Sequence, residues 1–200
     1  MTLRRTLLGM ALALSTLGLA QAQNATSATP QVKFTTSAGE FVVELYPDKA
    51  PNTVENFVTY VRDGHYNGSI FHRVINNFMI QGGGYDARYM EKPTRPSIKH
   101  EGAEAKAKGG PTNTVGTIAM ARTNNPHSAS AQFFINVNNN DFLNHSAPSG
   151  QGWGYVVFGK VISGMEVVNK IKQMPTGAGG PFPSDVPQTQ VVIQSAALVK

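Results

Sequence analysis

Arg73 is the one permanently charged side chain in a thirteen-residue stretch, residues 71–83, that otherwise carries apolar and neutral polar groups. Charged residues in apolar surroundings are usually paired with an opposite charge. The stretch therefore allows two interpretations. Arg73 is either a structural arginine paired with a carboxylate at the rim of a sheet, or a hydrogen-bond donor beside a hydrophobic pocket.

Chemistry that needs a metal, a covalent nucleophile or a nucleotide finds no support in the sequence. The histidines are His65, His72, His100, His127 and His145, and none has the spacing of a metal-binding motif. The chain has no cysteine, and no serine lies in a G-x-S-x-G motif. The glycines at 82–84 lack the spacing of a dinucleotide-binding loop. We therefore expect no metal and no cofactor, so any catalysis is conformational or electrostatic.

Two short strands should position Arg73. With a period of two residues, Phe71 and Arg73 point to one face and His72 to the other. The pair Asn76-Asn77 predicts a turn or bulge, because asparagine tolerates left-handed backbone. A second strand then places Met79 and Gln81 on one face, before the glycines at 82–84.

Strand periodicity recurs along the chain and predicts a mainly β fold. Strands are expected at 32–37, 40–46, 116–122, 132–137, 155–161 and 190–199, and helices at 51–64 and 165–172. We expect segment 101–108 to be a surface excursion and segment 176–187 to be a Gly/Pro loop. Seven or eight strands with few crossover helices favour an antiparallel sheet closed as a barrel.

The N-terminus has the pattern of a secretory signal peptide over residues 1–22. Arg4 and Arg5 precede a 14-residue apolar run, and small residues follow at Ala20 and Ala22. The alternative is an uncleaved anchor, although the run is short for a membrane span. Residues 23–30 should then be a disordered mature N-terminus, and residues 31–200 a single domain. Without the two arginines the net charge falls to +3, with no basic run that would indicate nucleic-acid binding.

Several separated blocks resemble the cyclophilin family of peptidyl-prolyl cis-trans isomerases. They are FHRVINNFMIQGG (71–83), TIAMAR (117–122), AQFFINV (131–137), DFLN (141–144) and YVVFGKV (155–161). The resemblance covers nearly the whole mature chain, and the PHSASAQFFINV and QGWGYVVFGKV blocks are similar to the bacterial branch, including its exported members. It implies a closed eight-stranded antiparallel β-barrel capped by two α-helices.

The resemblance also assigns the site residues. Arg73 is the implied catalytic residue. The implied substrate-binding residues are a proline pocket of Phe78, Met79, Phe134 and Leu143, backbone contacts from Gln81 and Gln132, and groove residues Ala121, Arg122, Phe142 and Tyr155. Phe142 stands where the family has a tryptophan and Tyr155 where it has a histidine, and the common asparagine at position 122 is absent. Loss of the indole N–H predicts that any cyclosporin binding is weak.

We therefore expect an isomerase that accelerates rotation of X-Pro bonds while exported proteins fold in the periplasm. Its partners would be proline-containing peptides and unfolded exported proteins. We expect a monomer with no nucleic-acid contact, and no membrane contact after signal cleavage. Two alternatives share the same residues: a non-catalytic chaperone or adaptor that holds proline segments, and a purely structural barrel.

Overall fold

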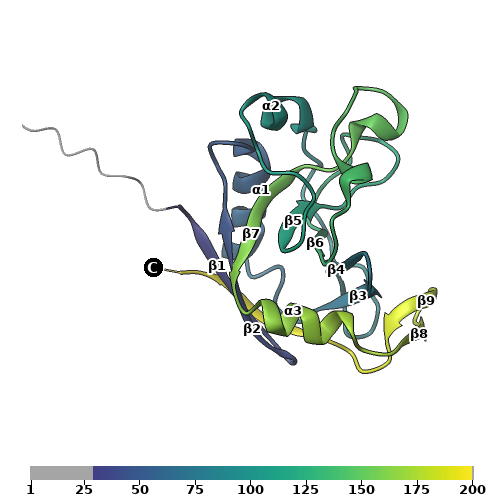
Figure 1. Ribbon diagram of the computed structural model, residues 1–200. Coiled ribbons are helices and arrows are strands. Elements are labelled where there is room, and N and C mark those ends of the chain that lie inside the picture. Colours follow the sequence, from purple (N-terminus) through teal and green to yellow (C-terminus); the bar gives the residue numbers. More distant parts are fainter. Residues whose placement is uncertain (1–28, 200) are drawn as a thin grey trace, which may run out of the picture.

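The computed structural model describes residues 29–199 and consists mainly of one antiparallel sheet (Figure 1). The predicted signal peptide, 1–22, and most of the predicted disordered segment, 23–30, lie outside the described residues. The sheet contains β1 (Gln31–Thr36), β2 (Gly39–Leu45), β3 (Ser69–Ile75), β4 (Met79–Asp86), β5 (Thr117–Met120), β6 (Phe133–Asn136), β7 (Val157–Ser163) and β10 (Ile193–Leu198). Their order is β10-β1-β2-β7-β5-β6-β4-β3.

The two end strands of this order approach each other and nearly close the sheet into a barrel. The backbone N–H of Phe71 in β3 donates to the carbonyl of Val191 at 3.0 Å, and that of Gly68 donates to Ile193 at 2.8 Å. An isolated bridge joins Ile70 to Val192. The prediction of a mainly β, eight-stranded antiparallel barrel is confirmed.

Aromatic rings fill the barrel because alternate strand residues point inward. Phe34 stacks on Phe41 with ring centroids 4.8 Å apart, and Phe57 packs against Phe133 and Phe158 at 5.9 and 4.9 Å. All five side chains are buried in one cluster. This core fixes the sheet whose other surface carries the site.

Three α-helices accompany the sheet within residues 29–199, although two were predicted. They are α1 (Pro51–Arg62), α2 (Gly102–Ala107) and α3 (Met165–Lys172). The predicted apolar stripe of α1 is confirmed, since Val54, Phe57, Val58 and Val61 are buried in the core. Among the described residues, no helix is long and apolar enough to cross a membrane.

Segment 101–108 lies largely at the surface, as predicted, but it forms the short helix α2, and its first residue, Glu101, is buried and holds the start of α1. The side chain of Glu101 accepts hydrogen bonds from the backbone N–H groups of Asn52 (3.1 Å) and Thr53 (2.8 Å). It also accepts from the amide of Asn52 and the hydroxyl of Thr53 at 2.8 and 2.7 Å. Ala50, the N-cap residue, gives α1 no side-chain cap. Glu101 therefore satisfies donors that every helix leaves open at its N-terminus.

Segment 176–187 is not a loop. It forms a second, two-stranded sheet of β8 (Thr176–Gly179) and β9 (Phe182–Pro187). Figure 1 shows this hairpin in yellow, outside the barrel and next to β3. Three prolines and three glycines in twelve residues obscured the strands, since both residue types disfavour regular ladders.

We predict that replacing Glu101 with glutamine lowers the free energy of unfolding by about 1–3 kcal/mol. The amide keeps one acceptor but turns an NH2 group toward backbone donors, which leaves buried N–H groups unpaired. Urea unfolding followed by circular dichroism measures the change. Glu104→Gln, on the exposed side of α2, is the matched control and should cost less than about 0.5 kcal/mol. Equal effects of the two substitutions would contradict the capping role.

Candidate active site

A cavity of about 460 Å³ opens on the outer side of β3, β4 and β6. It is lined by His72, Arg73, Phe78, Met79, Gln81, Tyr85, Ala121, Arg122, Gln132, Phe134, Leu143, Tyr155, Phe182, Pro183, Ser184 and Asp185. The structure thus brings together ten of the eleven predicted site residues. The eleventh, Phe142, lies next to the cavity.

A β-bulge turns Arg73 toward this cavity. The pairing of β3 with β4 shifts register between Phe71 and Arg73. Phe71 consequently enters the barrel core with Val74, whereas His72 and Arg73 both line the cavity. The prediction that Phe71 and Arg73 share a face is wrong, because the extra residue of a bulge breaks strict alternation.

The Arg73 guanidinium is accessible and loosely placed beside one carboxylate. Its side chain is 44% exposed, and Nε lies 4.0 Å from Oδ2 of Asp185. That distance is too long for a hydrogen bond. Within residues 29–199 the guanidinium donates no hydrogen bond to another group. The arrangement favours the donor interpretation of Arg73 over the structural ion pair.

Apolar side chains form the cavity wall as a cluster separate from the barrel core. Met79, Phe134 and Leu143 are buried together, and Phe78 is partly buried against them. Alternation in β6 places Phe134 here while Phe133 and Ile135 enter the core, as predicted. Phe78 reaches the same wall from the turn that precedes β4. The wall offers a dry surface suited to a small apolar ring.

Two glutamines supply the amide groups of the site. Nε2 of Gln81 donates to Oε1 of Gln132 at 3.0 Å. This bond leaves the carbonyl of Gln81 and the NH2 group of Gln132 to accept from and donate to a peptide backbone. Gly84 makes room for the pair, since a Cβ atom there would lie 2.5 Å from the Gln132 side chain.

Arg122 lies at the rim of the cavity and is held there by several contacts. Its Nε donates to the carbonyl of Gly154 at 2.9 Å, and Nη1 donates to that of Thr123 at 2.8 Å. The guanidinium carbon lies 4.6 Å from the ring centroid of Tyr155, a cation–π contact. Tyr155 in turn meets Phe134 edge to face at 5.5 Å. The Arg122 side chain is therefore engaged in holding the wall.

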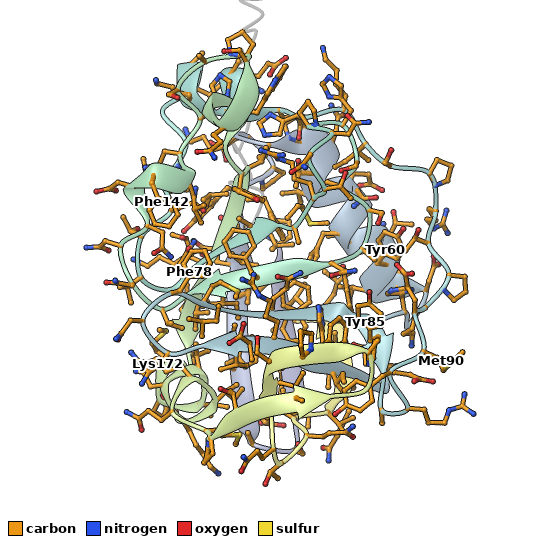
Figure 2. The ribbon with its side chains drawn as sticks, turned by 90° about the vertical axis from the view of Figure 1, so that its right-hand side faces the viewer. Tyr60, Phe78, Tyr85, Met90, Phe142 and Lys172 are labelled. Atoms are coloured by element: carbon orange, nitrogen blue, oxygen red, sulfur yellow. The ribbon has the colours of Figure 1, made fainter. Side chains whose placement is uncertain are left out.

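Phe142 is an exposed aromatic beside the cavity. It is 72% exposed, and its ring stacks on Phe78 with centroids 5.7 Å apart. Figure 2 shows the two rings on the same side of the molecule, away from Tyr85. Phe142 lines a neighbouring cavity of about 500 Å³ that shares Arg122, Leu143 and Tyr155 with the first.

Sequence reasoning missed six residues that line the cavity. Two come from the main sheet and four from the β8–β9 hairpin: His72, Tyr85, Phe182, Pro183, Ser184 and Asp185. Because the sequence predicts a loop over 176–187, it does not predict where these hairpin side chains lie. The one signal was Phe182, an aromatic residue inside a segment rich in glycine and proline.

Comparison with known proteins identifies the family and the fold. The family model described as cyclophilin type peptidyl-prolyl cis-trans isomerase/CLD matches residues 31–198. The chain belongs to this family. The cyclophilin prediction is confirmed, and with it the enzyme class: the protein is a peptidyl-prolyl cis-trans isomerase.

Bacterial relatives of this cyclophilin are similar over most of its length. Peptidyl-prolyl cis-trans isomerase B of Escherichia coli K12 is 54% identical over 167 residues, covering 84% of this chain and 98% of the relative. Peptidyl-prolyl cis-trans isomerase A of Dickeya dadantii is 47% identical and covers 98% of both chains.

Solved structures share the fold of this cyclophilin. A Cryptosporidium parvum cyclophilin type isomerase superposes with a TM-score of 0.64 at 24% identity, over 86% of this chain and 98% of that one. A second structure of that protein, determined in the presence of the dipeptide Ala-Pro, gives a TM-score of 0.63.

His72 is the one titratable group of the cavity with a strongly shifted pKa. Its ring lies between Tyr85 and Phe182, with centroids at 4.7 and 5.3 Å. Burial, and secondly the positive charge of Arg73, lower the pKa of His72 from 6.5 to about 4. Its Nδ1 atom has no hydrogen-bond partner among the described residues. His72 is therefore a neutral ring at pH 7.

This shift predicts that His72 makes the cyclophilin less stable in mild acid. In the unfolded chain His72 binds a proton below about pH 6.5, whereas in the native chain it does so only below about pH 4. The free energy of unfolding therefore falls as the pH falls through this window. Between pH 7 and pH 5, His72 should lower the free energy of unfolding by about 2 kcal/mol.

The measurement is the free energy of unfolding in urea at several pH values, for the wild type and for His72→Phe. The phenyl ring keeps the packing and cannot titrate. Burial also lowers the pKa of His65 and of His100, so part of the slope remains in the variant. Identical pH slopes in both proteins would refute the assignment.

Proposed function

We propose that Arg73 accelerates isomerisation by donating a hydrogen bond to the proline nitrogen as the X-Pro amide twists. Met79, Phe134 and Leu143 would hold the proline ring while the preceding carbonyl turns. The observation that supports this most is the position of Arg73. Its guanidinium stands beside an apolar wall, 44% exposed, with its nearest carboxylate 4.0 Å away.

Amide resonance explains why such a donor would help. Rotation about the X-Pro bond has a barrier of about 18–20 kcal/mol because twisting breaks the conjugation between nitrogen and carbonyl. The twisted nitrogen regains a lone pair that the planar amide lacks. A donor aimed at that lone pair binds the transition state more tightly than the ground state, which is the condition for catalysis.

The hydrogen bond alone does not supply the whole effect. A bond to a charged donor contributes about 1.5–3 kcal/mol, which corresponds to about 10- to 150-fold in rate. The apolar wall adds to this in two ways. It fixes one end of the rotating bond, and its dry surface disfavours the charge-separated planar amide.

The substrates we propose are proline-containing peptides held along the cavity. A volume of about 460 Å³ is ample for a proline ring and the adjoining peptide groups. The unused carbonyl of Gln81 and NH2 group of Gln132 suit a peptide backbone. The Cryptosporidium parvum relative was determined in the presence of Ala-Pro, which is consistent with this substrate class.

We predict that Arg73→Ala lowers kcat/KM for a short X-Pro peptide by about 10- to 150-fold and leaves the fold intact. Arg73→Lys should recover only part of the loss, because a lysine lacks the planar fork of donors. Arg62→Ala, which removes an exposed arginine from α1, is the control. Normal isomerisation by a folded Arg73→Ala protein would reject the proposed role.

We also propose that the isomerase acts on exported proteins in the periplasm. Support comes from the N-terminal pattern alone: two arginines, a 14-residue apolar run and small residues at 20 and 22. A segment of this kind is cleaved from exported proteins.

The test of export is fractionation of a two-membrane bacterium that produces either the full chain or a chain without residues 2–22. The full chain should appear in the periplasmic fraction with its N-terminus near Gln23, whereas the shortened chain should stay in the cytoplasm. An unprocessed full chain in the membrane fraction would favour the anchor.

Weak cyclosporin binding is the remaining part of the proposal. Phe142 lies beside the cavity and stacks on Phe78, but a phenyl ring has no N–H to donate. We predict that Phe142→Trp tightens inhibition by about 2- to 12-fold, the effect of one hydrogen bond. Phe142→Leu serves as the control for ring loss. Equal inhibition constants for wild type and Phe142→Trp would contradict the prediction.

A further inference from the structure

The β8–β9 hairpin closes one end of the cavity without belonging to the barrel. Phe182, Pro183, Ser184 and Asp185 of β9 line the cavity, opposite the rim held by Arg122. In Figure 2 the yellow hairpin lies below the strands that carry the site, close to Tyr85. Apart from the pairing of its own two strands, the hairpin packs mainly against β3.

Aromatic packing fixes the hairpin in this place. The ring of Phe182 lies 5.0 Å from that of Tyr85, edge to face, and 5.3 Å from His72. Gly180 lies so close to Tyr89 that a Cβ atom there would collide with its ring. The side chains that follow Phe182 are therefore presented by an anchored strand.

Asp185 is the one carboxylate among the described residues that line the cavity. Its side chain is 38% exposed, and its one ion pair within residues 29–199 is the long contact with Arg73. Its backbone has φ of 65°, a left-handed conformation that a residue other than glycine adopts at some cost. Such strained residues concentrate at functional sites.

We propose that Asp185 makes the hairpin end of the cavity a charge-selective subsite for a residue next to the substrate proline. A lysine or arginine there would place its cation near the carboxylate and its methylene stem against Phe182 and Tyr85. An acidic residue would meet like charge. The proposal rests on the proposed function, because it assumes that the proline ring occupies the apolar wall.

Arg73 does not cancel this selectivity. The two side chains are both partly exposed, and 4.0 Å separates Nε from Oδ2, so their pairing is weak. When the guanidinium donates to the proline nitrogen, the carboxylate still has its lone pairs. The other cation of the cavity, Arg122, is engaged at the far rim with Tyr155 and Gly154.

The test uses two series of short peptides with Lys, Ala or Glu either directly before or directly after the proline. For each protein, kcat/KM of the Lys and Glu peptides is divided by that of the Ala peptide. In one series the Lys-to-Glu ratio should be about two- to five-fold higher in wild type than in Asp185→Asn. Asparagine tolerates the left-handed backbone, so this variant keeps the hairpin.

Two further measurements separate charge from structure. Raising the salt concentration should shrink the wild-type ratio and leave that of Asp185→Asn nearly unchanged, because exposed charges are screened. Asp185→Lys should lower the ratio below that of Asp185→Asn. Glu55→Gln, which changes the net charge equally from the far surface of α1, should keep the wild-type ratio.

The proposal is overturned if wild type and Asp185→Asn give equal ratios in both series, or if Glu55→Gln shifts the ratio as much. These outcomes are distinct from failure of the Arg73 mechanism. That mechanism is judged on the Ala peptide with Arg73→Ala, whereas the charge ratio is measured in proteins that keep Arg73.

Discussion

The site depends on one arrangement. The guanidinium of Arg73 lies beside an apolar wall and forms no short ion pair. Burying a charge is costly unless it is paired, and a close ion pair would occupy the N–H donors that we propose for the twisted amide. The structure meets both demands by placing Arg73 at the surface of the sheet. There its side chain is partly exposed to solvent, while Met79 and Phe134 are buried beside it.

The barrel makes this possible by separating two apolar clusters with one sheet. Phe133 and Ile135 pack inward, whereas Phe134, between them, belongs to the outer wall. Rigid inner packing of aromatic rings holds β4 and β6 in register, so the wall and the two glutamines stay at fixed spacing. The register shift between Phe71 and Arg73 in β3 then turns Arg73 outward.

The sequence predicts most of this from periodicity and resemblance, but not the features that depend on distant contacts. The strands of the barrel, the stripe of α1 and the alternation in β6 follow from local patterns of apolar residues. The bulge at Arg73 does not, because it depends on how β3 pairs with β4. The position of Asp185 does not follow either, because the prolines and glycines of segment 176–187 hid the hairpin. The role of Glu101 could not be predicted, because its partners lie 48 and 49 residues earlier in the chain.

The cap supplied by Glu101 also has a consequence for how the chain is made. A ribosome releases residues 51–62 well before residue 101, so the first turn of α1 emerges with its N–H groups open to water. Only when the later segment arrives can the carboxylate close that turn. The capped helix can therefore pack on the barrel only late in folding, in a step that needs long-range contacts. A nascent chain halted before position 101 would lack the cap.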